Sequence, residues 1–447
     1  MARGKKTAQG LTPEEKLAQA LVPAEEQPYE IPENWCWTYL LSGAAECMDS
    51  FRKPVNSSER AQREGDIPYY GATGQVGWID DYLTDEQLVL LGEDGAPFLD
   101  LMKDKAYLIE GKAWVNNHAH VLKSRYGEYG NRFLVHYLNT FNFQGFVNGT
   151  TRLKLTQASM NEMPVPVTPL SEQQRIVDRI ENIFAKLDEA KEKAQAVVDG
   201  FELRKSAILH KAFTGELTAK WREEHGLTME SWELKRLGDC GQWTGGGTPN
   251  TSHTEYWDGG KIMWITAKDM KSDEIEDTQM HITYLGVENS SANYIEVPSL
   301  LVVMRSGILR RTLPICMVKQ PFTVNQDLKA ISPIDGLNLE YFFWACKNSE
   351  RKILTSCMKN GTTVESINAK ALMDFQITIA TYEEQIEIAC CINNFLTKEQ
   401  QAKEAAEAVI DQIDTMKKAV LARAFRGELG TNDPTEESAM ELLKTVI

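Results

Sequence analysis

The chain has 447 residues, of which 42% are apolar and 25% are charged, so it is long enough for two to four domains with their own cores. Disorder is excluded because ten Trp, 14 Tyr and 15 Phe supply ample core-forming surface. A membrane-spanning protein is excluded too, since the longest near-continuous apolar stretch, residues 297–304, is much shorter than the ~20 residues that a spanning helix needs.

The net charge of −16, from 48 basic and 64 acidic side chains, is unevenly distributed. Residues 33–167 carry 12 basic and 17 acidic side chains, residues 232–379 carry 15 and 17, and residues 380–447 carry 7 and 13. A typical nucleic-acid binder is basic, so contact with DNA would depend on local basic loops. Two such groups exist, with solvated surface charge as the simpler interpretation: Arg52, Lys53, Arg60 and Arg63, then Arg305, Arg310 and Arg311.

The eight cysteines are scattered without C-x-x-C spacing, and Cys390 is adjacent to Cys391. This arrangement suits neither an ordinary disulfide framework nor a zinc framework. No apolar run follows the basic residues 1–6, so we expect no secretory signal. We therefore predict reduced thiols and a cytoplasmic protein.

In chain order, the pattern predicts two mixed regions of helix and strand, each followed by a long helix. Residues 1–32 form an N-terminal extension, in which Thr12 to Glu15 could cap a short helix. The expected domains are 33–168, a first globular domain; 169–231, a central spacer helix and linker; 232–380, a second globular domain; 381–429, a distal spacer helix; and 430–447, a tail helix beginning near Pro434. Strand-like runs lie at 87–91, 261–265 and 298–304, and turn-rich or loop segments at 69–74 and 244–249.

The strongest signal is an internal repeat at an offset of 212 residues. Between residues 171–217 and 383–429, 21 of 47 positions are identical without a gap. The offset extends upstream to two Asn-Gly-Thr-Thr segments, 148–151 and 360–363, and a weaker start signal lies at Asn34-Trp35 and Ser231-Trp232. The repeating unit is therefore a variable globular region followed by a helix.

Both repeated helices carry apolar or small residues at a 3.5-residue period, which is typical of a helix-on-helix seam. We expect the two helices, each of about 40 residues, to pair antiparallel around a pseudo-twofold axis; the alternative is one ordinary amphipathic helix per domain. Ser171 and Thr381 have capping-box spacing at the two starts, and Gly215 and Gly427 would end the helices. The expected spacer core is Ile176, Ile180, Ile183, Leu187, Val197, Phe201, Ile388, Ile392, Phe395, Val409, Ile413 and Val420.

Signals for catalysis are weak, and we expect no catalytic residue and no metal on this chain. Phosphate-loop, dinucleotide-binding and zinc-protease motifs are absent from the sequence. Asp100, Glu110 and Lys112 superficially match a metal-dependent nuclease. His118 and His120 share one face of a strand and could bind a metal, but structural histidines are the preferred interpretation. The glycines at 245–247 are explained by a tight turn, with a phosphate-binding loop as the alternative.

Two diverged domains on a fixed spacer suit a bipartite DNA site, because dimeric readers place two domains in grooves about one helical turn apart. Polar and aromatic loop residues could read base edges or contact the backbone. Besides the basic residues above, we selected these candidates by residue type and loop position: Tyr69, Tyr70, Thr73, Gln75, Thr150, Thr151, Thr248, Asn250, His253, Lys268, Asn325, Gln326, Thr362 and Thr363.

Nearly the whole chain resembles the specificity subunits of type I restriction-modification systems. The resemblance depends on an ordered set of segments that includes residues 34–35, 67–72, 114–119, 166–174 and 246–249, both Asn-Gly-Thr-Thr segments and both Ala-Phe-x-Gly-Glu-Leu helix ends. The second helix departs from the pattern because no prolines precede Glu384.

The resemblance implies an α+β fold with two target-recognition domains, separated by two long antiparallel helices in a pseudo-twofold repeat. It implies that each domain reads one half of an asymmetric, gapped DNA site and that the chain is not itself catalytic. Its implied partners are double-stranded DNA, two modification subunits that use S-adenosylmethionine, and restriction subunits that use ATP and Mg²⁺. The alternatives are a coiled-coil scaffold without DNA readout and a stand-alone Mg²⁺-dependent nuclease.

Overall fold

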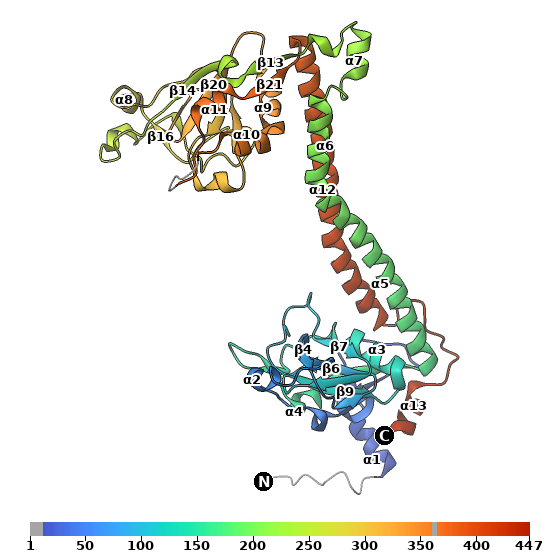
Figure 1. The fold of residues 1–447 in the computed structure, drawn as a ribbon. Helices are drawn as coiled ribbons and strands as arrows, with labels where there is room; N and C mark the ends of the chain where they lie inside the picture. Colours follow the sequence, from blue (N-terminus) through green and yellow to red (C-terminus); the bar gives the residue numbers. More distant parts are fainter. Residues whose placement is uncertain (1–11, 360–363) are drawn as a thin grey trace. The chain divides into compact units, whose positions relative to one another are not determined.

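The computed structural model describes residues 12–359 and 364–447 (Figure 1). The chain divides into two compact units, of which unit 1 comprises residues 1–195 and 407–447 and unit 2 comprises residues 196–406. Within the described ranges, no helix combines the length and the apolar character needed to cross a membrane. Each unit mixes β-sheets with helices, as the α+β prediction requires.

Unit 1 contains two four-stranded sheets, with strand orders β2-β9-β6-β7 and β4-β3-β8-β5, and two small two-stranded sheets, β1-β12 and β10-β11. Its strands are β1 (Cys36–Tyr39), β2 (Ala45–Cys47), β3 (Ile67–Gly71), β4 (Gly74–Ile79), β5 (Thr84–Asp85), β6 (Leu88–Gly92), β7 (Ala106–Ile109), β8 (Lys112–Val115), β9 (Ala119–Ser124), β10 (Val147–Asn148), β11 (Lys154–Leu155) and β12 (Pro164–Val167). Its shorter helices are α1 (Pro13–Ala20), α2 (Ser57–Arg60), α3 (Gly127–Leu138), α4 (Gln157–Met160) and α13 (Ala439–Val446).

Unit 2 contains a four-stranded sheet of order β14-β20-β17-β18, a three-stranded sheet β16-β15-β19 and the pair β13-β21. Its strands are β13 (Glu233–Arg236), β14 (Gly241–Gly245), β15 (Ile262–Ile265), β16 (His281–Ile282), β17 (Ser299–Val303), β18 (Ile315–Val318), β19 (Phe322–Val324), β20 (Leu328–Pro333) and β21 (Gln376–Ile379). Its helices include α6 (Phe201–Phe213), α7 (Ala219–Glu224), α8 (Tyr284–Glu288), α9 (Leu339–Asn348), α10 (Glu350–Cys357) and α11 (Ala369–Asp374).

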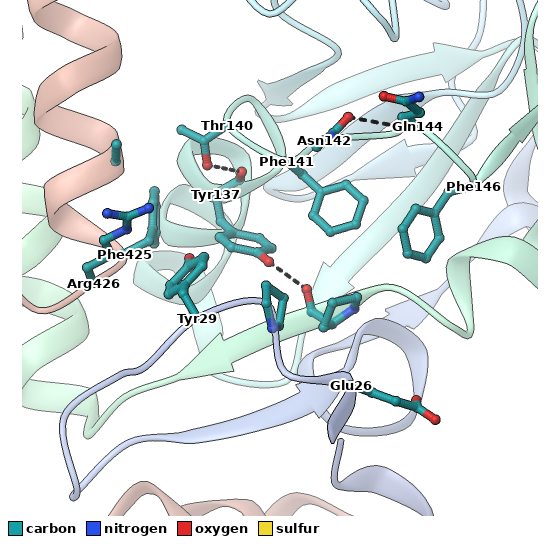
Figure 2. Close-up of a pocket in the computed structure, with 13 residues that line it drawn as sticks. Glu26, Tyr29, Tyr137, Thr140, Phe141, Asn142, Gln144, Phe146, Phe425 and Arg426 are labelled. Atoms are coloured by element: carbon teal, nitrogen blue, oxygen red, sulfur yellow. Dashed lines mark hydrogen bonds between the residues drawn. The ribbon is translucent and has the colours of Figure 1, made fainter. Parts of the chain in front are cut away.

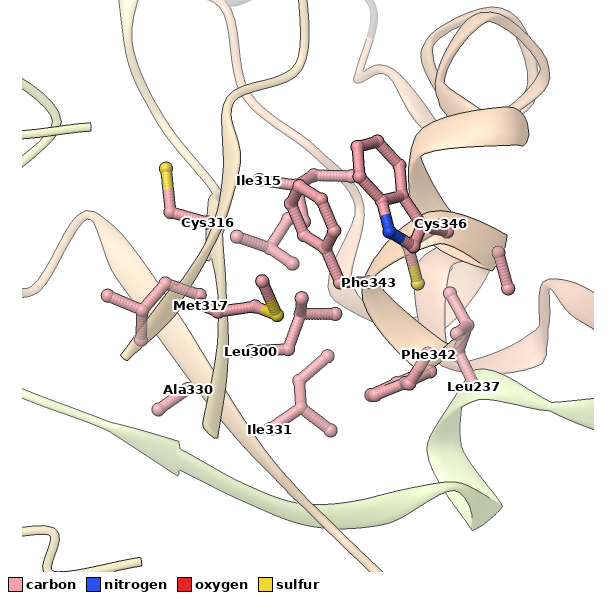
Figure 3. Packing of buried hydrophobic residues seen from close by; sticks show 14 of the residues in the cluster. Leu237, Leu300, Ile315, Cys316, Met317, Ala330, Ile331, Phe342, Phe343 and Cys346 are labelled. Carbon is pink, nitrogen blue, oxygen red and sulfur yellow. The ribbon is translucent and has the colours of Figure 1, made fainter. Parts of the chain in front are cut away.

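The core of unit 2 forms where α9 packs on the four-stranded sheet. Figure 3 shows Phe342, Phe343 and Cys346 of the helix facing Leu300 of β17 and Ile331 of β20. All five side chains are buried. The continuous apolar run of β17 fits this position, because a strand covered on both faces needs no polar alternation. This core holds in place the loops that leave the strand ends.

The long helices are α5 (Leu170–Asp199), its continuation α6, and α12 (Tyr382–Ala424). In unit 1, Lys191 pairs with Asp414 at 2.8 Å and Asp188 pairs with Lys417 at 2.5 Å. In unit 2, Arg204 pairs with Glu399 at 2.5 Å. In unit 1, residue numbers that rise along α5 meet numbers that fall along α12, so the helices run antiparallel, as predicted. The first helix differs from the single 40-residue helix that we expected, because the α5 and α6 segments are separated at position 200.

The heptad serves partly as domain core rather than as helix seam. Ile176 and Ile180 belong to the main hydrophobic cluster of unit 1, and Ile388 and Ile392 belong to that of unit 2. Each helix therefore begins by packing on its own globular region. Phe395 and Val409 are 45% and 42% exposed, so they correct the predicted spacer core, because helix pairing alone does not cover them. Ile413 is buried, whereas the remaining predicted core positions are half-buried: Ile183, Leu187, Val197, Phe201 and Val420.

The same construction anchors both helix starts. The indole Nε1 of Trp35 donates to Glu172 at 2.7 Å, and that of Trp232 donates to Glu384 at 2.7 Å. The strand pairs β1-β12 and β13-β21 lie directly before these starts and are both antiparallel. The weak Asn-Trp and Ser-Trp start signal in the sequence thus marks the tryptophan that holds each spacer helix to its domain.

Helix ends follow the glycine prediction but not the capping-box prediction. Gly215 and Gly427 have φ of +80° and +74°, which glycine adopts without the strain that a Cβ would cause. Ser171 lies inside α5 and donates to Glu436 at 2.7 Å. The buried hydroxyl of Thr381 has no hydrogen-bond partner in the described part of the chain. Both capping-box predictions are therefore wrong, because the Ser171 hydroxyl bonds to Glu436 and the Glu384 carboxylate accepts from Trp232.

Both chain ends outside the spacer carry the predicted short helices. The Thr12 hydroxyl accepts from the amide of Glu15, and the Glu15 carboxylate accepts from the amide of Thr12. These two hydrogen bonds form a capping box at the start of α1, which confirms the predicted cap. The tail helix α13 begins later than expected, with Ser438 as its cap, and Pro434 lies in the turn before it. Leu443 of α13 is buried in a small cluster against Cys36 and Val167. The extension and the tail therefore both complete unit 1.

Candidate functional site

Three predicted DNA-contacting residues of unit 2 line one hollow of about 660 Å³. Lys268 follows β15, Arg305 follows β17 and Asn325 follows β19. The strands β15 and β19 are parallel neighbours, with Ile265 opposite Val324, so the residues after them meet at one edge of the sheet. Backbone hydrogen bonds hold the Asn325 loop to β15 and to the end of β17: Asn325 N to Ile265 O at 3.0 Å, and Met304 N to Asp327 O at 2.8 Å.

Side-chain hydrogen bonds fix the loops around this hollow. Asp269 accepts from the amide and the hydroxyl of Thr266, both at 2.8 Å. Arg305 donates to Asp327 at 2.8 Å, while the hydroxyl of Thr248 donates to Gln326 at 2.7 Å. The hollow is therefore a preorganised polar surface with cations, amides and carboxylates in fixed positions, which is what hydrogen-bond readout of base edges needs.

The glycine-rich segment 245–247 has a packing role. A Cβ on Gly246 would lie 1.7 Å from the carbonyl oxygen of Val324, and one on Gly247 would lie 1.9 Å from the hydroxyl of Ser291. Asn293 donates to the carbonyl of Gly245 at 2.8 Å. Close packing therefore explains these glycines, and the phosphate-binding alternative gains no support.

The other unit 2 candidates lie on exposed loops. Arg310 forms an ion pair with Glu365, Arg311 is exposed, and Asn250 accepts hydrogen bonds from Ser252. The exposed His253 stacks on Tyr256 with ring centroids 5.0 Å apart, and its Nδ1 lies 2.8 Å from Glu255. The candidates Thr362 and Thr363 lie outside the described residues.

In unit 1, Tyr69 and Arg52 are corrected by the structure. Tyr69 is 2% exposed, and its hydroxyl accepts from the amide of Val55 at 3.0 Å, so this side chain belongs to the core. Arg52 is half-buried and holds Asp49 at 2.8 Å together with Glu93. Both residues stabilise the domain from inside and are not placed to read DNA.

The remaining unit 1 candidates lie at the surface or partly below it. Arg60 stacks on the ring of Tyr69 at 4.7 Å, and Arg63 stacks on Trp114 at 4.6 Å while pairing with Asp80. Cation–π stacking holds these guanidinium groups against the domain surface. Tyr70 is half-buried, and the following candidates are exposed: Lys53, Thr73, Gln75, Thr150 and Thr151.

The nuclease alternative gains no support from geometry. Glu110 accepts from Gln87 at 3.0 Å, Asp100 pairs with Lys103 at 3.5 Å, and Lys112 stacks on Tyr82. Neither carboxylate belongs to a group of potential metal ligands within the described ranges.

The two histidines of β9 and the turn before it have different partners. His118 Nδ1 lies 2.7 Å from Asp94, whereas the buried His120 faces Asp49.

A second hollow, of about 500 Å³, lies in unit 1 and contains none of the predicted contact residues. Figure 2 shows the aromatic rings that line it, among them Tyr29 of the extension, Tyr137 and Phe141 at the end of α3, and Phe425 after α12. Burial raises the pKa of Tyr29 to about 12. Its several aromatic rings distinguish it from the hollow of unit 2, whose lining includes Lys268, Asp269 and Arg305.

Sequence reasoning missed several residues that line the polar hollow. Thr266 and Asp269 follow β15 and Asp327 follows β19, so their position just after apolar strands is the signal that could have found them. Trp264 lies within β15, and Gln279 and Met280 directly precede β16, so that signal does not reach them. Loop residues at strand ends often carry function. A prediction that took every polar residue after β15 and β19 would have included Thr266, Asp269 and Asp327.

Comparison with known proteins identifies the family. The family model described as type I restriction modification DNA specificity domain matches residues 45–198 and again residues 229–409. The chain belongs to this family, and each of the two matches includes one globular region of the repeat.

Among curated relatives, the chain is 34% identical over 197 residues to the Escherichia coli type I restriction enzyme EcoR124I/EcoR124II specificity subunit. The aligned segment covers 42% of this chain and 49% of that protein. It is 30% identical over 173 residues to the MjaIX specificity subunit of Methanocaldococcus jannaschii, 38% of this chain and 39% of that protein. The chain thus spans half or less of the length of these relatives.

Two solved structures share the fold. The HsdS subunit from Thermoanaerobacter tengcongensis matches with a TM-score of 0.61 and 17% identity, over 90% of this chain and all of that chain. A chain from a structure of complex assembly and conformational transition in the type I R-M system matches with a TM-score of 0.62 and 16% identity, with the same coverage. At these identities the similarity establishes the fold.

Proposed function

We propose that this chain is the DNA specificity subunit of a type I restriction-modification complex. Each globular domain reads one half of an asymmetric bipartite site, and the paired helices set the gap and dock two modification subunits. The chain is not catalytic by itself. Partner subunits supply adenine methylation with S-adenosylmethionine, and restriction subunits supply ATP- and Mg²⁺-dependent cleavage, in the cytoplasm.

The observation that supports this proposal is the duplicated unit, in which a recognition-sized domain is fixed to the start of a spacer helix by the same Trp–Glu hydrogen bond. A scaffold needs paired helices but no such globular domains. The main sheets of the two domains, β2-β9-β6-β7 and β14-β20-β17-β18, share one strand order, whereas the loops between their strands differ in sequence, so the domains suit two unlike half-sites. The polar hollow of unit 2 supplies side chains of the kinds that read base edges.

The test is a map of modified adenines in the host genome, with and without this gene. We expect a methylated motif with two unlike half-sites around a fixed gap, which disappears on deletion and returns on complementation. An unchanged map in a strain that expresses the partner subunits contradicts the proposal. In that case the scaffold alternative becomes the better explanation.

Within this function, we expect Asn325→Ala to relax discrimination at one position of the half-site read by unit 2. Asn325 lines the hollow and is 9% exposed; its backbone amide donates to the Ile265 carbonyl and its Oδ1 accepts from the amide of Asp327 at 3.1 Å, so its side-chain NH2 is the group left to contact a base. Loss of a good base-edge contact costs about 1–3 kcal/mol. The measurement is binding of the assembled methyltransferase to matched and singly substituted DNA. The control is Asn289→Ala, an exposed asparagine of the same unit outside the residues that line the hollow; equal effects of the two changes would contradict the assignment.

A further inference from the structure

A compact group of three different ligand types lies in unit 1, where β2 pairs with β9. The Sγ of Cys47, a carboxylate oxygen of Asp49 and a ring nitrogen of His120 lie within 4.8 Å of one another. Cys47 ends β2, Asp49 follows in the next turn, and His120 lies on β9. The strands are antiparallel neighbours, and the amide of Val121 donates to Asp49 at 2.9 Å, so the backbone itself brings the three side chains together.

The hydrogen bonds of His120 point to a cation at its second nitrogen. This side chain is buried, and its Nε2 lies 3.0 Å from the carbonyl oxygen of Leu155, which can only accept, so Nε2 donates. In the neutral ring, Nδ1 then carries a lone pair, yet it faces Asp49 Oδ2 at 2.7 Å. Two acceptors at this distance need either a proton or a metal ion between them.

We propose that Cys47, Asp49 and His120 form a binding site for one zinc ion. Sulfur, nitrogen and oxygen ligands together select zinc over magnesium or calcium. A histidine that binds zinc usually donates its other N–H to a carbonyl or carboxylate, as His120 does to Leu155. Ligand atoms around tetrahedral zinc are separated by roughly 3.3–3.8 Å, so side-chain shifts of about 1 Å complete the site.

The surrounding charges are compatible with the ion. A cysteine thiolate and the Asp49 carboxylate together balance the charge of zinc. Arg52 pairs with Asp49 and Glu93, and Lys154 pairs with Glu93 at 2.9 Å. Because a carboxylate offers about four lone-pair positions, Asp49 can bind the metal while keeping Arg52 and the amide of Val121. Water or Glu93, whose Oε2 lies 4.0 Å from His120 Nδ1, would complete the four ligands.

The role of this ion is structural. It would join β2, the turn at Asp49 and β9, and through Leu155 also β11, which follows the first Asn-Gly-Thr-Thr segment. The site departs from our expectation of no metal, because Asp49 and His120 are 71 positions apart and their proximity is set by strand pairing. The inference depends on this cluster and not on the proposed DNA specificity.

The first test uses Co²⁺ as a spectroscopic substitute for zinc in the purified full chain. We expect one Co²⁺ per chain, with a thiolate-to-cobalt charge-transfer band that equimolar Zn²⁺ removes. Cys47→Ser should abolish the band, while His118→Gln and Cys391→Ser, the matched controls, should retain it. A band that survives Cys47→Ser, or no band in the natural chain, overturns the proposal.

A second test needs no substitution and so does not depend on the folding of a variant. Alkylation of Cys47 in the natural chain is followed by peptide mass spectrometry, with and without one equivalent of Zn²⁺. We expect zinc to slow the modification of Cys47 at least tenfold and to leave that of the exposed Cys390 unchanged. Equal rates at Cys47 with and without zinc would show that a proton, not a metal, lies between His120 and Asp49.

Discussion

We expect Glu384→Gln to lower the free energy of unfolding of unit 2 by about 3–5 kcal/mol, the usual cost of breaking a buried ion pair from one side. Glu384 is fully buried, and one of its oxygens accepts from Thr218 at 2.7 Å and from Arg222 at 2.5 Å. Its other oxygen accepts from Trp232 at 2.7 Å. The glutamine keeps the shape but leaves the buried guanidinium of Arg222 without its charge partner.

The matched control is Glu172→Gln in unit 1. Glu172 accepts from Trp35 in the same way, but its further donors are the neutral Asn432 and Thr431. Burial raises the pKa of Glu172, so its charged form is disfavoured in the folded chain. A carboxyl with a raised folded pKa contributes stability below its unfolded pKa and loses it as pH rises through the folded pKa. Glu172→Gln should therefore be neutral or stabilising at pH 7.5.

The measurement is urea unfolding at pH 7.5, with hydrogen exchange used to follow the two units separately. A double variant, Glu384→Gln with Arg222→Met, should recover part of the loss, because it removes the unpaired charge. If Glu384→Gln and Glu172→Gln cost the same, the two anchors depend on hydrogen bonds alone and the role given to Arg222 is wrong.

The repeat could be predicted from sequence because it left identical residues at a constant offset. The helix starts show one structural basis for the identities: Glu172 and Glu384 each accept a hydrogen bond from the tryptophan at the start of their own repeat. The antiparallel pairing followed from the heptad. The heptad could not show which apolar residues face the other helix, because Ile176 and Ile388 repeat with the same period but pack on their own domains.

The candidate site was harder to predict because its residues are chosen by contacts between distant positions. The sequence predicts Arg52 to be a surface cation, but in the structure it is half-buried because it pairs with Glu93, 41 positions away. Arg305 and Asn325 belong to one hollow because β17 and β19 end near each other. Residue type and loop position alone do not carry this information. Tyr69 illustrates the limit, since alternation along β3 decides that it faces inward.

We expect exchange of residues 237–375 with the corresponding segment of another type I specificity subunit to replace one half of the methylated motif completely. This exchange leaves the pair β13-β21, Trp232 and Glu384 in place, so the new domain is attached to the spacer helix as before. The half-site read by unit 1 and the gap should stay unchanged, because neither unit 1 nor the helices are altered.

The matched control is the reciprocal exchange of residues 40–163, between β1 and β12, which should replace only the other half of the motif. The readout is long-read mapping of methylated adenine, with co-purification of the modification subunits to show that each hybrid assembles. A hybrid that assembles yet keeps the original motif would contradict readout by that domain. A change in both halves would mean that the two domains do not read DNA independently, since hydrogen-bond readout is local to the side chains that reach the bases.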